Sequence, residues 1–369
     1  MGKIGWRLTP STLSTLQRLG LLRDDADIAV TRVCPPIQDE PPFPPYDLPP
    51  FERNPIRCPT PRKTGWIREF KGPLSVEYRT GLFYKGLRLV RNSWDGLYLP
   101  EYIEATNPLR SGRMRRQYID QGIVLAGVFD GNYHHFLTEF TAKVELVERS
   151  GLPLSIPFVV SEAMSKRRIL AQARELGLFG ARPVFVHKRR HWLEAGRLFT
   201  VYPDRFAARA DNFIARRLGA RPDPQRRDRL YVSRNLAGGV VRGIRNEAEL
   251  IPGLKARGFE IVDPASWPLK RQIERFAVAS LVVGPHGAGL TNIMFRAGAP
   301  LALVEIIPDN KEWRYHFCEM THHFGFFYLP LLGRSETGSD ETAPFDVDVE
   351  VTLKAVDAAV DWERRRYAS

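Results

Sequence analysis

The stretch VVGPHGAGLTN, residues 282–292, decides how this chain folds. An apolar run ends here, the chain turns on the glycines at 284, 287 and 289, and a helical pattern follows. A strand that passes through a glycine turn into a helix is one unit of an α/β domain, and the backbone N–H groups at such a helix start can bind an anion. The spacing G-x-x-G-x-G is neither that of dinucleotide binders nor a P-loop. We therefore expect a phosphate site, with a ligand-free glycine turn as the alternative.

The same alternation of apolar runs and helical patterns continues on both sides of this stretch, from about residue 122 to residue 330. Short strands are expected over 66–125, for example at 81–90. Continuous apolar strands between helices predict parallel sheets that are covered on both faces. The predicted fold class is α/β, with two Rossmann-like doubly wound domains facing a cleft. Strands are expected at 122–129, 156–160, 183–186, 197–201, 229–233, 259–262, 281–283, 301–306 and 326–329, and helices at 133–149, 165–176, 204–218, 246–257, 269–279, 288–297 and 313–323.

Proline-rich, turn-forming and acidic segments divide the chain into four parts. Eleven prolines between residues 35 and 61 forbid helix and sheet, so residues 1–65 are expected to be an extension with a proline-rich strap. GARPDP at 219–224 stops a helix and predicts a boundary between domains at 66–221 and 222–335. An acidic linker and a helix at 349–367 complete the chain as the part 336–369. The helix at 246–257 is expected to begin at a capping Asn246 and to kink or shorten at Pro252.

Composition limits the classes of protein. The chain has 369 residues, and 54 Lys and Arg against 42 Asp and Glu give a net charge of +12. No apolar run reaches 18 residues, no secretory signal is evident, and the three cysteines lack metal-ligand spacing, so we expect a cytoplasmic protein without a required metal. Basic residues gather at 110–116, 187–191 and 363–366. Most of this charge is expected to be solvated surface, with an anionic membrane surface or, less readily, nucleic acid as the partner.

Candidate phosphate-binding residues lie around the glycine turn and after a neighbouring strand. Arg234 follows the strand at 229–233, and a guanidinium suits a diphosphate. Glu305 ends the strand after the turn, where an acidic residue can bind ribose hydroxyls or be merely solvated. His286 in the turn can donate to a phosphate oxygen. The full set of expected donor-site residues is Arg234, Arg242, Arg245, His286, Gly287, Ala288, Gly289, Leu290, Asn292 and Glu305; Arg242 or Arg245 could instead pair with acidic residues on the surface.

A second cluster, GNYHHFLTE at 131–139, follows the strand at 122–129. His135 and Glu139 are four residues apart on the expected helix, so the carboxylate can orient the imidazole. Such a pair can remove a proton from a hydroxyl group, or it can simply support the helix. We take His135 and Glu139 as catalytic candidates, without deciding which is the base. Asn132, Tyr133 and His134 are expected to contact the substrate.

Together these motifs resemble the family 61 glycosyltransferases, which include bacterial capsular polysaccharide biosynthesis proteins. The resemblance covers about residues 120–330, with Phe136 where the family usually has Trp. It implies a GT-B architecture and inverting transfer from a nucleotide sugar, usually a UDP-sugar, to a glycan or lipid-linked acceptor. It also implies that Arg234, His286 and the turn at 287–290 hold the diphosphate, Glu305 the nucleoside, and that His135 and Glu139 face the acceptor. The alternatives are a non-catalytic nucleotide- or sugar-binding protein on the same scaffold and a nicotinamide-dependent oxidoreductase.

Overall fold

The computed structural model describes residues 5–7, 10–23, 65–78, 81–90, 93, 104–106, 114–126, 131–202, 208–235, 242–310, 316–336 and 342–368. The proline-rich strap expected at 35–61 lies outside these residues. The chain divides into two compact units, unit 1 with Met1–Asp39 and Arg62–Arg205, and unit 2 with Glu40–Pro61 and Phe206–Ser369. This division falls at 205–206, whereas the sequence placed it after residue 221. None of the helices described here is long and apolar enough to cross a bilayer.

Unit 1 is built on a mixed sheet. Its eight strands lie in the order β2-β5-β4-β3-β10-β7-β8-β9. β10, β7, β8 and β9 form one parallel part and β2 and β5 another, while β3 runs antiparallel to both β10 and β4. The expectation of an all-parallel sheet is therefore wrong for this unit. The strands are β2 (Leu22–Arg23), β3 (Trp66–Val76), β4 (Phe83–Lys85), β5 (Arg88–Val90), β7 (Arg115–Val124), β8 (Phe158–Ser161), β9 (Val184–His187) and β10 (His191–Tyr202).

The difference has a local cause in the run at 81–90, where one strand was expected. Gly86 has a φ of 60°, a left-handed conformation that glycine adopts without strain, and the chain reverses there. The run becomes the antiparallel hairpin of β4 and β5. A separate pair, β1 (Gly5–Arg7) and β6 (Glu104–Thr106), is also antiparallel.

One long helical segment in unit 1 carries the second sequence cluster. It comprises α2 (Tyr133–His135), the π-helical turn η3 (Phe136–Phe140) and α3 (Thr141–Arg149), and so fills the range expected for one helix. The π-helical turn was not expected. The other helices of the unit are α1 (Pro10–Arg18), α4 (Glu162–Ser165) and α5 (Arg168–Glu175).

Unit 2 has the parallel sheet that its apolar strands predict. The order is β12-β11-β13-β14-β15-β16, and all neighbours are parallel except the short edge strand β16. Every residue of the two central strands β13 (Ala279–Pro285) and β14 (Ala302–Pro308) is buried. In chain order the five parallel strands run 2-1-3-4-5, a doubly wound order whose ligand crevice lies where neighbouring strands 1 and 3 end. The remaining strands are β11 (Asp228–Val232), β12 (Phe259–Val262), β15 (Phe327–Ser335) and β16 (Phe345–Asp346).

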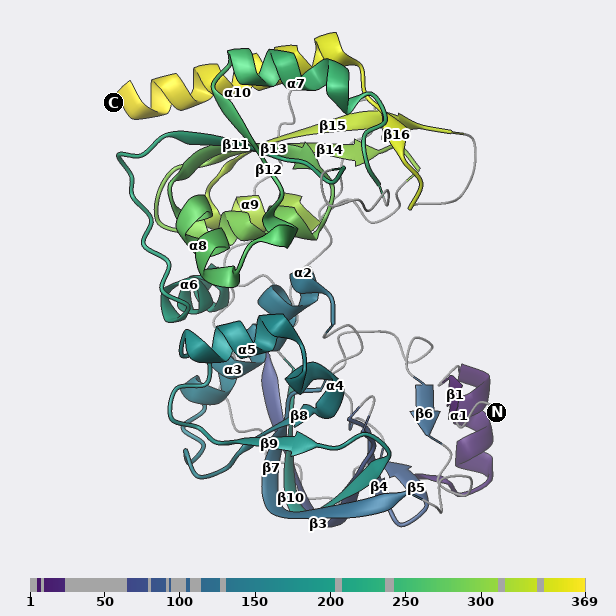
Figure 1. Ribbon diagram of the computed structural model, residues 1–369. Coiled ribbons are helices and arrows are strands. Elements are labelled where there is room, and N and C mark those ends of the chain that lie inside the picture. The colour runs from purple at the N-terminus through teal and green to yellow at the C-terminus, as the bar shows by residue number, and fades with distance from the viewer. Residues whose placement is uncertain are drawn as a thin grey trace. The chain divides into compact units, whose positions relative to one another are not determined.

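Helices cover both faces of this sheet (Figure 1). α7 (Glu247–Ala256) and α10 (Val349–Ala368) lie on one face and share its apolar core, while α8 (Leu269–Ala277) and α9 (His316–Phe324) lie on the other. α6 (Ala208–Arg217), η4 (Pro264–Ser266) and η5 (Ala288–Arg296) complete the unit. The α-helix expected at 288–297 is instead the 3-10 helix η5.

α7 begins after Asn246, as expected, and runs through Pro252, so the expected shortening at this proline does not occur. Asn246, expected to cap it, makes no capping bond and instead uses both ends of its amide: Nδ2 donates to the carbonyl of Val347 at 2.9 Å, and Oδ1 accepts from its N–H at 3.0 Å.

A fully buried arginine fastens the C-terminal helix to the rest of unit 2. The guanidinium of Arg296 donates to the carbonyl oxygens of Pro300, Asp223, Ala277 and Arg226 and to the hydroxyl of Tyr367 near the end of α10. These acceptors come from separate segments of the unit, so this side chain joins them. Burying a charge is tolerated only when its donors find acceptors, and each nitrogen of this guanidinium has at least one.

Candidate functional site

The glycine turn lies where β13 ends, next to the end of β11, and it needs two of its glycines for space. A Cβ on residue 284 would lie 2.9 Å from the carbonyl oxygen of Val232 on β11. A Cβ on residue 287 would lie 1.7 Å from Nη1 of Arg234. The φ of Gly287 is 172°, which any residue adopts, so at this position the arginine and not the backbone requires a glycine.

The structure thus brings Arg234 directly onto the turn. Its Nη1 donates to the carbonyl oxygen of His286 at 3.3 Å, and the side chain is only partly exposed. Burial, and then the positive charge of Arg242, lower the pKa of Arg234 to about 10. The guanidinium is therefore still charged at neutral pH, and a second cation lies close to it. Two arginines held together at a strand end form a site that favours an anion.

Arg242 and Arg245, the other two arginines expected at the phosphate site, have different surroundings. Arg242 adopts a left-handed conformation with a φ of 57° and acts electrostatically on Arg234. Arg245 points elsewhere: its Nη1 donates to Glu336 at 2.7 Å, and its Nε donates to Asp346 at 3.1 Å. Asp346 raises the pKa of Arg245, which is the signature of an exposed ion pair. The role of Arg245 in phosphate binding, expected from the sequence, is not supported.

His286 and Glu305 form a buried pair instead of two separate ligands. Nδ1 of His286 lies 2.5 Å from Oε1 of Glu305, and the hydroxyl of Tyr328 donates to Oε2 of Glu305 at 2.6 Å. Glu305 is fully buried, so the ribose-binding role expected for it has no surface to act on. The carboxylate fixes the imidazole, whose other nitrogen faces away from it. Tyr328 was missed by sequence reasoning, because it lies on the next strand and 23 residues away.

The rest of the expected donor-site residues shape the turn from inside or sit at its surface. Asn292 is fully buried, and its Nδ2 donates to Oε1 of Gln272 on α8 and to the carbonyl oxygen of Gly289. Leu290 is also fully buried. Ala288 and Gly289 are partly exposed. The hydrogen bond from Nδ2 of Asn292 to the carbonyl oxygen of Gly289 indicates that Asn292 supports the turn.

A buried acidic residue that was not among the predicted site residues positions the Arg234 loop. Glu247, buried at the start of α7, accepts from the hydroxyl of Tyr231 at 2.8 Å and from the hydroxyl of Ser233 at 3.0 Å. Burial, and then the Glu247 carboxylate, raise the pKa of Tyr231 well above its ordinary value, so the phenol stays protonated and keeps donating. These bonds fix the residue immediately before Arg234.

In unit 1, His135 and Glu139 form the pair that their spacing predicts. Nδ1 of His135 lies 2.7 Å from Oε1 of Glu139. The side chain of His135 is 19% exposed and that of Glu139 only 6%, so the imidazole is the more accessible partner. Glu139 lies within the π-helical turn η3, and such turns often occur at functional sites. Unit 1 therefore contains a buried carboxylate that holds a more accessible imidazole.

The three residues before His135 have mixed roles. Oδ1 of Asn132 accepts from the N–H of His134 at 2.9 Å, which caps the helix. His134 is buried and packs edge to face against His135, with ring centroids 5.4 Å apart. Tyr133 is partly exposed. Only Tyr133 and the exposed part of Asn132 have surface for the substrate contact that the sequence predicted.

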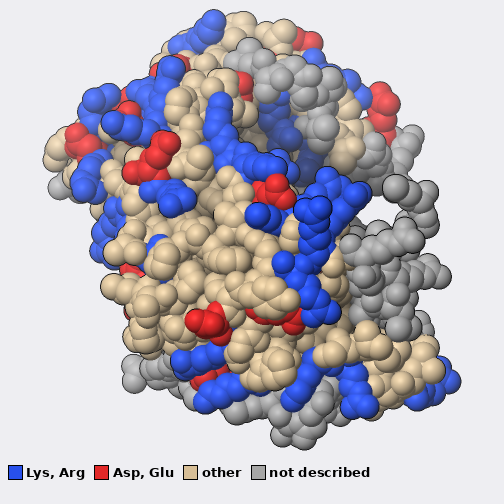
Figure 2. All heavy atoms as spheres, turned by 60° about the horizontal axis from the view of Figure 1, so that its bottom comes forward, with Lys and Arg blue, Asp and Glu red and all other residues tan. Residues whose placement is uncertain are grey.

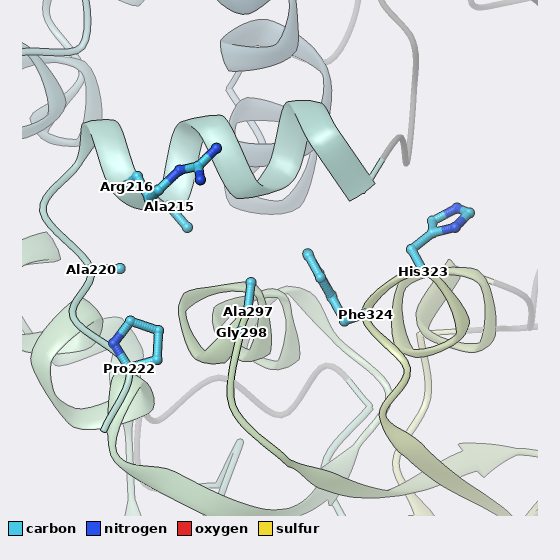
Figure 3. A pocket seen from close by; sticks show the side chains of 8 residues that line it. All are labelled: Ala215, Arg216, Ala220, Pro222, Ala297, Gly298, His323 and Phe324. Carbon is cyan, nitrogen blue, oxygen red and sulfur yellow. The ribbon is translucent and has the colours of Figure 1, made fainter. Parts of the chain in front are cut away.

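A hollow elsewhere in unit 2 contains none of the predicted residues (Figure 3). It has a volume of about 390 Å³, and small side chains, Phe324, Arg216 and His323 line it. It lies where η5 and α9 end, whereas the glycine turn lies where η5 begins. Among the residues that the structure describes, no group of three or more His, Cys, Asp or Glu side chains is placed to hold a metal ion.

A comparison with known protein families finds a match over the part of the chain that contains most of the candidate site residues. Residues 133–302 match the family model Glycosyltransferase 61. The match starts at the helix that carries His135 and Glu139, includes Arg234 and the glycine turn, and ends within β14, so it spans a little under half of the chain. It supports a glycosyltransferase of family 61, and the two parallel-rich sheets are consistent with the Rossmann-like folds of such enzymes. No curated protein matches the chain.

Proposed function

We propose that the protein is an inverting glycosyltransferase of GT-B type that uses a nucleotide sugar, with a UDP-sugar as the first candidate donor. One observation carries the proposal: Arg234 lies against Gly287 where β11 and β13 end. This is the topological switch point of a doubly wound sheet, the usual place for a nucleotide. A charged arginine, a second arginine beside it and an oriented histidine suit a diphosphate.

Unit 2 is assigned the donor. Arg234, with Arg242 near it, and Nε2 of His286 neutralise the charge that grows on the nucleoside diphosphate as it leaves the sugar. Glu305 holds Nδ1 of His286 and so fixes the orientation of that ring. In this proposal cationic side chains supply the stabilisation, and a metal ion is not required.

Unit 1 is assigned the base. The acceptor hydroxyl attacks the anomeric carbon from the side opposite the diphosphate, and the carbon–oxygen bond to the diphosphate breaks with its electron pair on the phosphate oxygen. Nε2 of His135 accepts the hydroxyl proton, and Glu139 holds Nδ1–H and balances the charge of the imidazolium. Inversion follows from this single displacement. The acceptor is proposed to be a glycan or a lipid-linked sugar, and the protein to work in the cytoplasm.

Two measurements test the proposal together. Release of UDP is followed over a panel of UDP-sugars and acceptors, and UDP binding is followed by titration calorimetry. Arg234→Ala is expected to lose UDP binding, while Glu139→Gln keeps binding and loses turnover. If UDP binds but no sugar donor is consumed with any acceptor, the protein is a non-catalytic nucleotide-binding protein. If UDP and other nucleotides do not bind, the proposal is wrong.

A further inference from the structure

Two basic stretches that lie far apart in the sequence meet at one place in unit 1. β7 begins with Arg115 and Arg116, and β10 begins with His191, which is the register partner of Arg115. The turn from 188 to 190 directly precedes β10. The side chains of Arg115, Arg116, Lys188, Arg189 and Arg190 are all exposed, and we call this group the basic corner. Figure 2 shows that Lys and Arg side chains gather in several groups on the face drawn there, with Asp and Glu side chains beside some of them.

The turn of the basic corner is held in place by its neighbours. Gln117 on β7 donates from Nε2 to the carbonyl of Val186 at 3.1 Å and accepts at Oε1 from the N–H of Lys188 at 2.7 Å. Glu162 accepts from the N–H of Arg189 at 2.8 Å and pairs with Lys166 at 2.6 Å, which brings one more cation to the turn. The cations are therefore displayed on a fixed backbone.

Neither backbone conformation nor ion pairing explains why the basic corner carries so many Lys and Arg residues. Arg190 has a φ of 59°, a left-handed conformation that favours glycine or asparagine over arginine. Within the described part of the chain, neither Arg115, Lys188 nor Arg190 takes part in an ion pair, whereas Arg116 pairs with Glu194 at 2.6 Å. The basic corner thus keeps an excess of positive charge at the surface.

Exposed apolar side chains accompany these cations. Tyr118 is 71% exposed and follows Arg116 by two residues, so both project from the face of β7 opposite to Arg115, where Glu194 is the register partner of Tyr118. Val186, next to the turn, is 37% exposed. Lysine and arginine together with an exposed tyrosine are the composition of surfaces that rest on lipid headgroups, where cations meet phosphates and aromatic rings enter the interface.

We propose that the basic corner binds the acidic headgroups of a phospholipid bilayer and seats unit 1 on a membrane. The partner is the lipid surface itself, and the interaction is separate from the sugar-transfer site. It is electrostatic in the main, so salt weakens it. Nucleic acid offers the same negative charge but no interface for Tyr118 and Val186, and it is therefore the competing outcome of the test.

Vesicle sedimentation tests this proposal on the full chain. Wild-type protein is expected to sediment with vesicles of phosphatidylglycerol and phosphatidylcholine in equal parts, and not with phosphatidylcholine alone. The variant Arg115→Gln, Lys188→Gln, Arg190→Gln is expected to bind about fivefold more weakly for each charge removed. The matched control removes three exposed cations elsewhere, Arg88→Gln, Lys255→Gln and Arg365→Gln, and is expected to bind as the wild type does.

Each other result overturns the proposal. Failure of the wild type to bind the acidic vesicles does so directly. Equal weakening in the control variant means that net charge, and not the basic corner, attracts the lipid. If the basic-corner variant loses binding to a labelled oligonucleotide but not to vesicles, the surface is one for nucleic acid. Thermal unfolding of all three proteins shows whether the substitutions, all at exposed positions, leave the fold intact.

Discussion

Replacing Gly287 by alanine should abolish the contact of Arg234 with the glycine turn while leaving the fold intact. The new Cβ would lie 1.7 Å from Nη1 and 2.9 Å from Cζ of Arg234, so the guanidinium has to leave. The backbone does not oppose the change, because a φ of 172° suits alanine. The structure therefore predicts a binding defect without a stability defect.

The size of the defect follows from what Arg234 is proposed to do. Hydrogen bonds from a charged donor contribute about 1.5–3 kcal/mol, so losing the arginine from a diphosphate weakens binding by about 10- to 150-fold. UDP affinity by titration calorimetry measures this loss. Because both changes remove the same contact, Gly287→Ala and Arg234→Ala together should weaken binding no more than Arg234→Ala alone.

Gly284→Ala is the matched contrast in the same turn. Its Cβ would lie 2.9 Å from the carbonyl oxygen of Val232, a backbone atom in the neighbouring strand that cannot move aside. Crowding of this kind costs about 1–3 kcal/mol, or roughly 2–4 °C in the unfolding temperature for each kcal/mol. The reasoning is refuted if Gly287→Ala binds UDP like the wild type, or if the double variant shows additive losses.

Three further substitutions probe the two halves of the site. Arg234→Met should unfold at a higher temperature than the wild type at pH 7. The pKa of Arg234 is lowered in the folded state, so its charged form costs folding free energy at every pH below about 10. An equal or lower unfolding temperature would contradict this. Tyr328→Phe leaves a buried oxygen of Glu305 without its hydrogen-bond donor and should lower the stability of unit 2 by about 1–3 kcal/mol. A thermal melt measures this loss, and an unchanged melting temperature would refute the prediction. Glu139→Gln should reduce turnover by about 10²–10⁴-fold through His135 while UDP affinity is kept, and a parallel loss of both would place Glu139 in the donor site instead.

The sheet of unit 2 could be predicted because its central strands are buried on both faces. Strands of this kind are rich in apolar residues, and the apolar stretches predicted to be strands, 281–283 and 301–306, overlap β13 and β14. The sheet of unit 1 could not be predicted in the same way. β10 is twelve residues long, and its first half mixes buried, partly buried and exposed positions without a regular alternation, so only its apolar end at 197–201 was recognised.

The candidate site was predictable where it depends on neighbours in the sequence. His135 and Glu139 share a helix, and Arg234 directly follows a strand, so their spacing carried the information. Glu305 was misread because its partner Tyr328 comes from the adjacent strand, and only the three-dimensional register brings the two together. The π-helical turn at 136–140 was not predicted, because the sequence around it was interpreted as one continuous helix over 133–149.

The buried guanidinium of Arg296 makes unit 2 depend on the last turns of α10. Its acceptors include the hydroxyl of Tyr367 near the end of α10, and Glu363 in the same helix accepts from Nε of Arg229 at 2.9 Å. If the last turns of α10 were removed, Arg296 and Arg229 would each lose an acceptor. Unit 2 is therefore expected to be less stable when this helix is shortened.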